Sequence, residues 1–159
     1  YNAIDKREVV GIDWGYFPDP NAIVGVKFDK NKRYVREIGC VKNQSDEDLV
    51  AMLKRNGCTS STNIVVPTDS GGGKSRAYLM THGFPRTHVF TKPAGSIKGG
   101  VKALRQAEVY YVMSNELEFE VGNYVFELDG NDDPTGDPAD KHNHLMDATR
   151  YVELYKPYL

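Results

Sequence analysis

The residues best suited to do chemistry in this sequence are three aspartates and a histidine that lie far apart along the chain. Asp13 lies inside an apolar, β-prone stretch, Asp69 follows a second such stretch, and His144 and Asp147 lie three residues apart near the end. Three carboxylates can hold two hard divalent cations about 4 Å apart, which activate water and stabilise the leaving oxygen of a phosphodiester. Oxygen ligation favours Mg²⁺ or Mn²⁺ over Zn²⁺. His144 can orient or deprotonate the attacking water, or bind Mn²⁺.

The stretch around Asp13, residues 9–16, is apolar without a regular alternation, which is typical of a central strand covered on both faces. An isolated ionised carboxylate there would cost several kcal/mol unless it is paired or bound to a metal. Gly11 and Gly15 flank Asp13 on the same face of the strand, so we expect them to leave room for an approaching group. A solvated Asp at the end of a strand is the alternative.

The last predicted helix carries a polar line with helical spacing, made of Asp140, His144, Asp147 and Tyr151. A solvent-facing stripe is the simpler explanation of such a line. The other two buried-type carboxylates, Asp13 and Asp69, favour a shared site instead. Asp140 is a less certain fourth carboxylate.

The run Gly71-Gly72-Gly73-Lys74-Ser75 is similar to a phosphate-binding loop. That motif requires a glycine five residues before Gly73, where this sequence has Thr68, and Asp69 would repel a phosphate. We therefore interpret the run as a glycine-rich turn that clears space beside Asp69, with Lys74 available to a DNA phosphate.

The formal net charge of −2 hides a strong segregation along the chain. Residues 71–106 contain seven basic side chains and no Asp or Glu, whereas the residues after them are strongly acidic. Such a block predicts a surface that faces a polyanion, although a solvated face balanced by the acidic tail is the alternative. The candidate DNA-binding residues are Lys74, Arg76, Lys92, Lys98, Lys102 and Arg105.

The elements that must position these residues follow from hydrophobic pattern and turn chemistry. We expect three strands joined by polar turns, then a helix that Ser45 opens and Gly57 closes, and then alternating strands and helices. The expected first three strands are 8–16, 22–28 and 33–41; the later ones are 63–68, 87–91 and 108–113; the later helices are 74–82, 96–106 and 142–155. Residues 124–128 are strand-like and 129–140 are expected to form a loop.

This order predicts an α/β fold with a mixed sheet, three antiparallel strands followed by parallel strands, and helices on both faces. The first and fourth strands would be neighbours, which would place Asp13 and Asp69 side by side at adjacent carboxyl ends. The 159 residues fit a single domain, and no apolar run approaches the ~20 residues that a membrane span requires. Two cysteines without metal-type spacing indicate no disulfide framework.

Three motifs together resemble the nuclease domain of tailed-phage large terminase subunits, over roughly residues 9–155. They are the first strand with Asp13, the fourth strand with Asp69 and its glycines, and residues 144–151, of which the last is the most specific. The resemblance implies an RNase H-like (retroviral-integrase-like) fold. It implies metal-dependent endonucleolytic cutting of concatemeric double-stranded viral DNA during packaging into the capsid. By position, Asp13, Asp69 and Asp147 would be the metal-binding acids for two Mg²⁺ or Mn²⁺ ions, with His144 as an auxiliary ligand.

The same resemblance implies partners and a context. These are double-stranded DNA, the portal protein, the small terminase subunit and the ATPase domain of the full-length chain, in the host cell cytoplasm. ATPase motor motifs are absent from residues 1–159, so we expect one C-terminal nuclease domain cut from a longer protein. The alternatives are another RNase H-like nuclease, such as a Holliday junction resolvase, and a non-catalytic module that docks on DNA or the portal.

Overall fold

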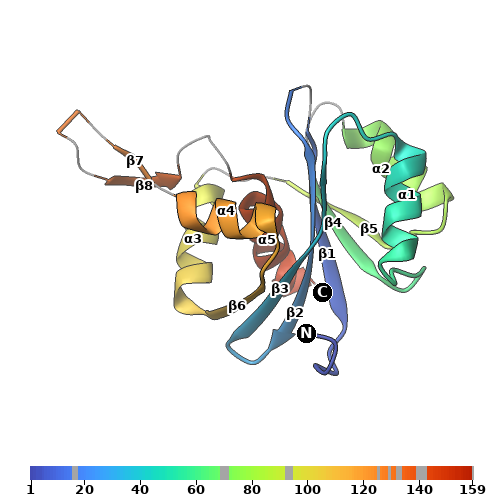
Figure 1. The fold of residues 1–159 in the computed structure, drawn as a ribbon, viewed down its shortest axis with the longest axis horizontal. Helices are drawn as coiled ribbons and strands as arrows, with labels where there is room; N and C mark the ends of the chain where they lie inside the picture. The colour runs from blue at the N-terminus through green and yellow to red at the C-terminus, as the bar shows by residue number, and fades with distance from the viewer. Residues whose placement is uncertain are drawn as a thin grey trace.

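The centre of the molecule is a six-stranded mixed sheet with the strand order β5-β4-β1-β2-β3-β6. The computed structural model describes residues 1–15, 18–68, 72–91, 95–124, 126–128, 130–131, 134–138 and 143–158. The strands are β1 (Glu8–Asp13), β2 (Asn21–Asp29), β3 (Lys32–Val41), β4 (Asn63–Pro67), β5 (Thr87–Phe90) and β6 (Glu108–Val112), as Figure 1 shows. The first three pair antiparallel, whereas β4, β5 and β6 pair parallel with β1, β4 and β3. The predicted mixed sheet, with the first and fourth strands as neighbours, is confirmed.

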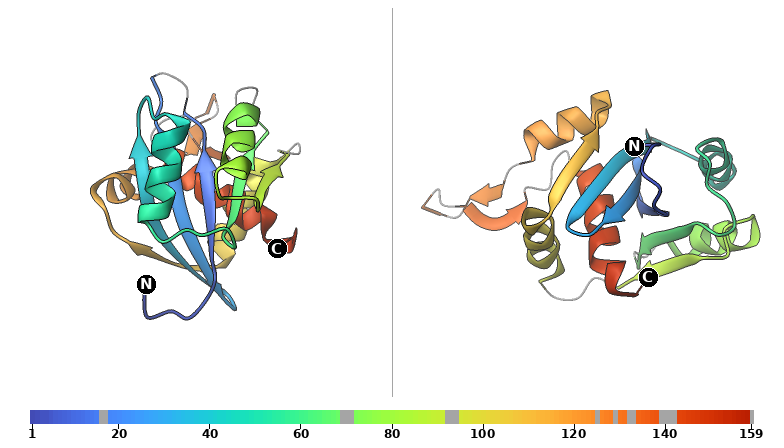
Figure 2. Two further views of the ribbon diagram at one scale, coloured as in Figure 1. Left: turned by 90° about the vertical axis from the view of Figure 1, so that its right-hand side faces the viewer. Right: turned by 90° about the horizontal axis from the view of Figure 1, so that it is seen from below.

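Helices cover both faces of this sheet. They are α1 (Asp46–Arg55), α2 (Gly72–Thr81), α3 (Ser96–Gln106), α4 (Asn115–Asn123), α5 (His144–Tyr155) and the short 3₁₀ helix η1 (Lys156–Tyr158). Figure 2 shows α1 and α2 on one side of the sheet and α3, α4 and α5 on the other. Ser45 caps α1 by accepting a hydrogen bond from the Asp48 amide at 3.1 Å, as the sequence predicts. None of the described helices is both long and apolar enough to cross a bilayer.

The central strand β1 contributes to a separate apolar core on each face of the sheet. Val10 and Ile12 pack in the core under α1 and α2, and Val9 packs in the core under α4 and α5. Strand β1 ends at Asp13, three residues before the predicted end, because the chain turns at Pro18 and returns as β2. The fold thus places Asp13 at the carboxyl end of a strand buried on both faces.

The two glycines beside Asp13 leave room for approaching groups, as expected, and those groups are backbone atoms of the protein itself. A Cβ atom at Gly11 would overlap the carbonyl oxygen of Ala148 in α5. A Cβ atom at Gly15 would overlap the backbone of Pro20 in the turn that follows. The helix backbone therefore lies directly against β1, and this close approach brings the residues of α5 to Asp13.

Two elements differ from the sequence-based expectation. Helix α4 occupies a stretch whose pattern is ambiguous, and its start is defined by Ser114, which accepts a hydrogen bond from the Leu117 amide at 3.2 Å. The predicted loop at residues 129–140 is wrong in part, because β8 (Pro134–Pro138) pairs antiparallel with β7 (Phe126–Leu128). This two-stranded ribbon projects from the body of the molecule (Figure 1). Prolines are tolerated there because each strand of a two-stranded ribbon is an edge strand.

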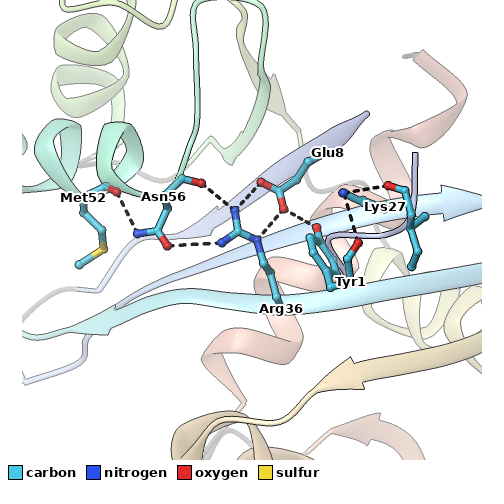
Figure 3. Close-up of polar contacts among 7 residues, drawn as sticks. Tyr1, Glu8, Lys27, Arg36, Met52 and Asn56 are labelled. Carbon is cyan, nitrogen blue, oxygen red and sulfur yellow. Dashed lines mark hydrogen bonds and ion pairs between the residues drawn. The ribbon is translucent and has the colours of Figure 1, made fainter. Parts of the chain in front are cut away.

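A polar network ties the opposite end of β1 to its neighbours. The guanidinium of Arg36 in β3 donates two hydrogen bonds to the Glu8 carboxylate, at 2.7 and 2.8 Å, and another to the carbonyl of Asn56 after α1, at 2.9 Å. The hydroxyl of Tyr1 also donates to Glu8 (Figure 3). This network fixes β1, β3 and α1 relative to one another at the end of the strand away from Asp13.

Candidate active site

Asp13 is the last residue of β1 and its side chain is buried, with 8% of the residue exposed. The Tyr151 hydroxyl donates a hydrogen bond to Asp13 Oδ1 at 3.0 Å, and His144 Nδ1 lies 3.3 Å from Asp13 Oδ2. Both partners come from α5. The burial excludes the alternative of a solvated aspartate at a strand end, and two donors offset the cost of removing this carboxylate from water.

His144 is the first residue of α5 and lies between two carboxylates. Its Nδ1 faces Asp13, and its Nε2 lies 3.8 Å from Oδ1 of Asp19 in the turn after β1. The hydrogen bond to Asp13 raises the pKa of His144 above its ordinary value, although burial of the ring opposes this, and the charges of Asp13, Asp19 and Glu120 add to the increase. The site therefore favours the charged form of the imidazole.

Asp147 lies one helical turn after His144 and is held by an arginine of the same helix. Arg150 Nη2 lies 2.5 Å from Asp147 Oδ1, and Arg150 is buried, with 3% of the residue exposed. The arginine packs across α3 at Gly100, where a Cβ atom would come within 2.8 Å of its side chain. A buried guanidinium fixes the Asp147 carboxylate in place and balances its charge.

Tyr151 contacts Asp13 and lies one helical turn after Asp147. It is buried, with 3% of the residue exposed, and its ring stacks on Phe90 at the carboxyl end of β5. Burial is the largest cause that raises the pKa of Tyr151, and the negative charges of Asp13 and Asp147 raise it further. The phenol therefore stays protonated and acts as a fixed hydrogen-bond donor to Asp13.

A glutamate from another helix caps the start of α5. Glu120 of α4 is buried, with 4% of the residue exposed, and it accepts hydrogen bonds from the amides of Leu145 at 2.8 Å and Met146 at 3.1 Å. Four contributions to the site were not expected from the sequence: Glu120, Arg150, Asp19 and the donor role of Tyr151. For Glu120 a signal exists, because it lies three residues after Leu117 and therefore on the same, buried face of its helix.

The structure brings the predicted residues Asp13 and His144 into contact, and the predicted Asp147 lies one helical turn after His144. Asp69, Asp140 and Lys92 lie outside the described residues, so their positions stay predictions. Strand β4 pairs parallel with β1, with Gly11 opposite Val65, so the two strands end at the same edge of the sheet. Within the described part of the chain, no three His, Cys, Asp or Glu side chains form a complete metal-ligand group.

The predicted basic residues fall on two different sides of the molecule. Lys74 and Arg76 lie on α2, which packs with α1 on one face of the sheet, whereas Lys98, Lys102 and Arg105 lie on α3, which packs against α5 on the other face. Figure 2 shows the two helices on opposite sides of the sheet. The described basic residues of this block on α2 and on α3 therefore do not form one continuous surface.

Lys74 is the basic residue with the clearest spatial relation to Asp13. It is exposed in the first turn of α2, which begins at Gly72. A Cβ atom at Gly72 would overlap the indole of Trp14, the residue after Asp13. Gly72 thus lets the start of α2 pack directly beside the end of the central strand.

A mixed sheet in this order, with helices on both faces and an aspartate at the end of its central strand, is an RNase H-like fold. No family model matches the sequence. The chain is 30% identical over 147 residues to the terminase large subunit of Bacillus phage SPP1, a match that covers 89% of this chain and 34% of that protein. The chain thus spans about a third of the length of this curated relative.

Comparison with solved structures also finds similarity to large terminase subunits. The large terminase nuclease domain of bacteriophage SPP1, solved with bound Mn, superposes with a TM-score of 0.83 at 28% identity, covering 96% of this chain and 87% of that one. The large terminase nuclease domain of phage P22 superposes with a TM-score of 0.72 at 18% identity, covering 99% and 86%. The predicted resemblance to the nuclease domains of large terminase subunits is confirmed.

Proposed function

We propose that this protein is a metal-dependent endonuclease that cuts concatemeric double-stranded viral DNA when a genome is packaged into the capsid. The observation that carries the proposal is the buried Asp13 at the end of the central strand, in contact with His144, which lies one helical turn before Asp147. Carboxylates and an imidazole gathered at the carboxyl ends of strands are the donor set expected of a site that hydrolyses phosphodiesters. The similarity to the SPP1 nuclease domain supports the same reading.

The donor set fits Mg²⁺ or Mn²⁺. Asp13, Asp147 and His144 would hold the metal together with Asp69, and the SPP1 relative was solved with bound Mn. In the protein alone, Tyr151 donates to Asp13, His144 lies against Asp13, and Arg150 pairs with Asp147, so each carboxylate is already held by a donor or a positive charge. Two bound ions would activate a water and stabilise the leaving oxygen of the phosphodiester.

The other residues of the site hold the carboxylates in position or transfer a proton. Tyr151 holds Asp13 Oδ1, and Arg150 holds Asp147 Oδ1, so each carboxylate keeps one oxygen fixed by the protein. His144 can accept or release a proton at Nε2, the nitrogen that faces the turn carrying Asp19. The arrangement is preorganised, because all these side chains come from one strand end and one helix.

The substrate contact is proposed to be mainly with phosphates. Lys74 is the leading candidate, because it lies in the first turn of α2 beside Trp14. The further candidates are Arg76, Lys92, Lys98, Lys102 and Arg105. Binding through lysines and arginines releases counterions, so affinity should fall steeply as salt is added.

The packaging context is also part of the proposal. Because this chain matches 34% of the SPP1 protein, we infer that it is the nuclease domain of a longer chain with an ATPase domain. Double-stranded DNA, the portal protein and the small terminase subunit would then be its partners. Concatemer cutting would require these partners, whereas nicking of free DNA would not.

The test is cutting of a supercoiled plasmid by purified protein. We expect nicked and linear products with Mn²⁺ and none with a chelator. Asp13→Asn should abolish cutting, whereas Asp29→Asn, which alters an exposed pair with Lys6, should cut like wild type. Cutting retained in Asp13→Asn would contradict the assignment. A strong preference for a four-way junction would indicate a resolvase, and absence of divalent-ion binding would indicate a docking module.

A further inference from the structure

We propose that Glu120 is a positioning residue that holds the metal-binding turn of α5 in place. The inference rests on the proposed function, because it concerns the same His144 and Asp147. Its basis is a contact that crosses between two helices: a carboxylate of α4 accepts hydrogen bonds from the first free amides of α5.

The start of α5 depends on this contact. The first amides of a helix have no partner within the helix, and a nearby side chain usually accepts from them. Asn143 is the N-cap residue of α5, but its side chain makes no capping hydrogen bond. Glu120 replaces it, with its carboxylate oxygens 2.8 and 3.1 Å from the Leu145 amide and one of them 3.1 Å from the Met146 amide.

The capped amides lie between the proposed metal ligands. Leu145 and Met146 follow His144 and precede Asp147, so the turn that Glu120 fixes is the turn that sets the distance between these two side chains. The negative charge of Glu120 also lies at the positive end of the α5 dipole, which stabilises the turn further. A shift of this turn would move His144 away from Asp13.

Glu120 is itself held firmly. Burial raises the pKa of Glu120, and the hydrogen bonds from Leu145 and Met146 counteract that rise. Helix α4 is anchored by Ser114, whose hydroxyl caps it and donates to Glu37 of β3, and by Leu117, which is buried in the core beside Leu145. Through α4, the glutamate therefore links the position of β3 to that of α5.

Glu120 is not itself a candidate metal ligand. Both of its oxygens already accept backbone hydrogen bonds, and the carboxylate is almost fully buried against α5. Its role is to position residues that bind, in the way that outer groups around metal sites orient the ligands themselves.

The test compares Glu120→Ala and Glu120→Gln with Glu118→Ala, which removes an exposed carboxylate from the same helix. Mn²⁺ affinity is measured by calorimetry without DNA, and exchange of the Leu145 and Met146 amides by NMR. We expect Glu120→Ala to bind Mn²⁺ about tenfold more weakly and to exchange these two amides at least about tenfold faster. Glu120→Gln keeps one acceptor oxygen, so it should lie between wild type and Glu120→Ala. Glu118→Ala should match wild type.

A control for simple loss of stability is Arg36→Met, which breaks the network of Figure 3 at the far end of the sheet. It should lower the melting temperature without changing Mn²⁺ affinity. Unchanged Mn²⁺ affinity in Glu120→Ala, or an equal loss of affinity in Arg36→Met, would overturn the positioning role while the proposed function stands. Wild-type protein that binds no Mn²⁺ would overturn the proposed function and this inference together.

Discussion

Asp13 stays in a buried position because the side chains of one helix satisfy its two oxygens. The hydroxyl of Tyr151 supplies one of these contacts at 3.0 Å, and a hydrogen bond to a charged group contributes about 1.5–3 kcal/mol. Tyr151→Phe would keep the ring that stacks on Phe90 and remove only the donor. We therefore expect the free energy of unfolding of the metal-free protein to fall by about 2 kcal/mol, measured by urea denaturation.

The matched control for that measurement is Tyr155→Phe, one turn further along α5. The Tyr155 ring stacks on His88, and its hydroxyl makes no hydrogen bond within the described part of the chain. Its loss should change stability by less than about 0.5 kcal/mol. Equal effects of the two substitutions would show that Tyr151 contributes packing alone.

The pKa of His144 should lie above the ordinary histidine value, and the pKa of His88 should lie below it. The pKa of His144 is raised from 6.5 by Asp13, whereas burial and the charges of Arg86 and Arg76 lower the pKa of His88. NMR titration of the metal-free protein measures both in one spectrum. The stabilisation from charged His144 is fully present below pH ~6.5 and is lost as the pH rises through its raised folded-state pKa. In Asp13→Asn the pKa of His144 should fall, and an unchanged value would contradict the pairing.

The sequence indicates the proposed metal ligands better than it indicates the residues that hold them in place. Asp13 is recognisable because a carboxylate in an apolar strand requires a partner, and His144 and Asp147 because their spacing places them on one helix face. Arg150 carries no such signal, since charged residues on helices are usually solvated, and Glu120 is indicated only by its spacing from Leu117. The burial of Arg150 results from tertiary packing that no local pattern encodes.

At the scale of elements, the site depends on how closely α5 lies on β1. A Cβ at Gly11 would overlap the Ala148 carbonyl and approach Val152 to 2.6 Å, so Gly11→Ala must push the helix away from the strand. We expect a loss of about 1–3 kcal/mol in the free energy of unfolding, together with weaker Mn²⁺ binding, because Asp13 and His144 separate.

Gly122→Ala is the control substitution that should raise the free energy of unfolding, whereas Gly11→Ala should lower it. Gly122 lies inside α4, and a Cβ there meets nothing within 4 Å. Alanine is favoured over glycine in a helix by about 0.5–1 kcal/mol, so this substitution should stabilise the protein and leave Mn²⁺ binding unchanged. Stabilisation by Gly11→Ala would contradict the close packing of α5 on β1.

The elements that the sequence predicts well are those with strong local signals. The meander β1–β3, helix α1 with its Ser45 cap, and the alternation through β4, α2, β5, α3 and β6 all have such signals. Helix α4 and strand β8 do not. The pattern around α4 is ambiguous, and β8 contains prolines at both ends, so their form depends on partners elsewhere in the molecule.

At the scale of the whole molecule, the basic residues are divided between opposite faces of the sheet, so one face should dominate contact with a duplex. Lys74 is exposed beside the end of β1, and Lys102 is exposed on α3 across the sheet. We predict that Lys74→Ala weakens DNA binding and lowers the slope of log affinity against log salt by about 0.9, the value for one phosphate contact. Lys102→Ala should have the smaller effect, and a larger one would place the duplex on the α3 face.

The most direct test of the central claim is a crystal of the protein soaked in Mn²⁺ and measured for anomalous scattering. We predict an anomalous peak at the carboxyl end of β1, in contact with the Asp13 carboxylate and with His144 or Asp147. Manganese bound elsewhere, with no peak at Asp13, in a protein that still cuts DNA would contradict it.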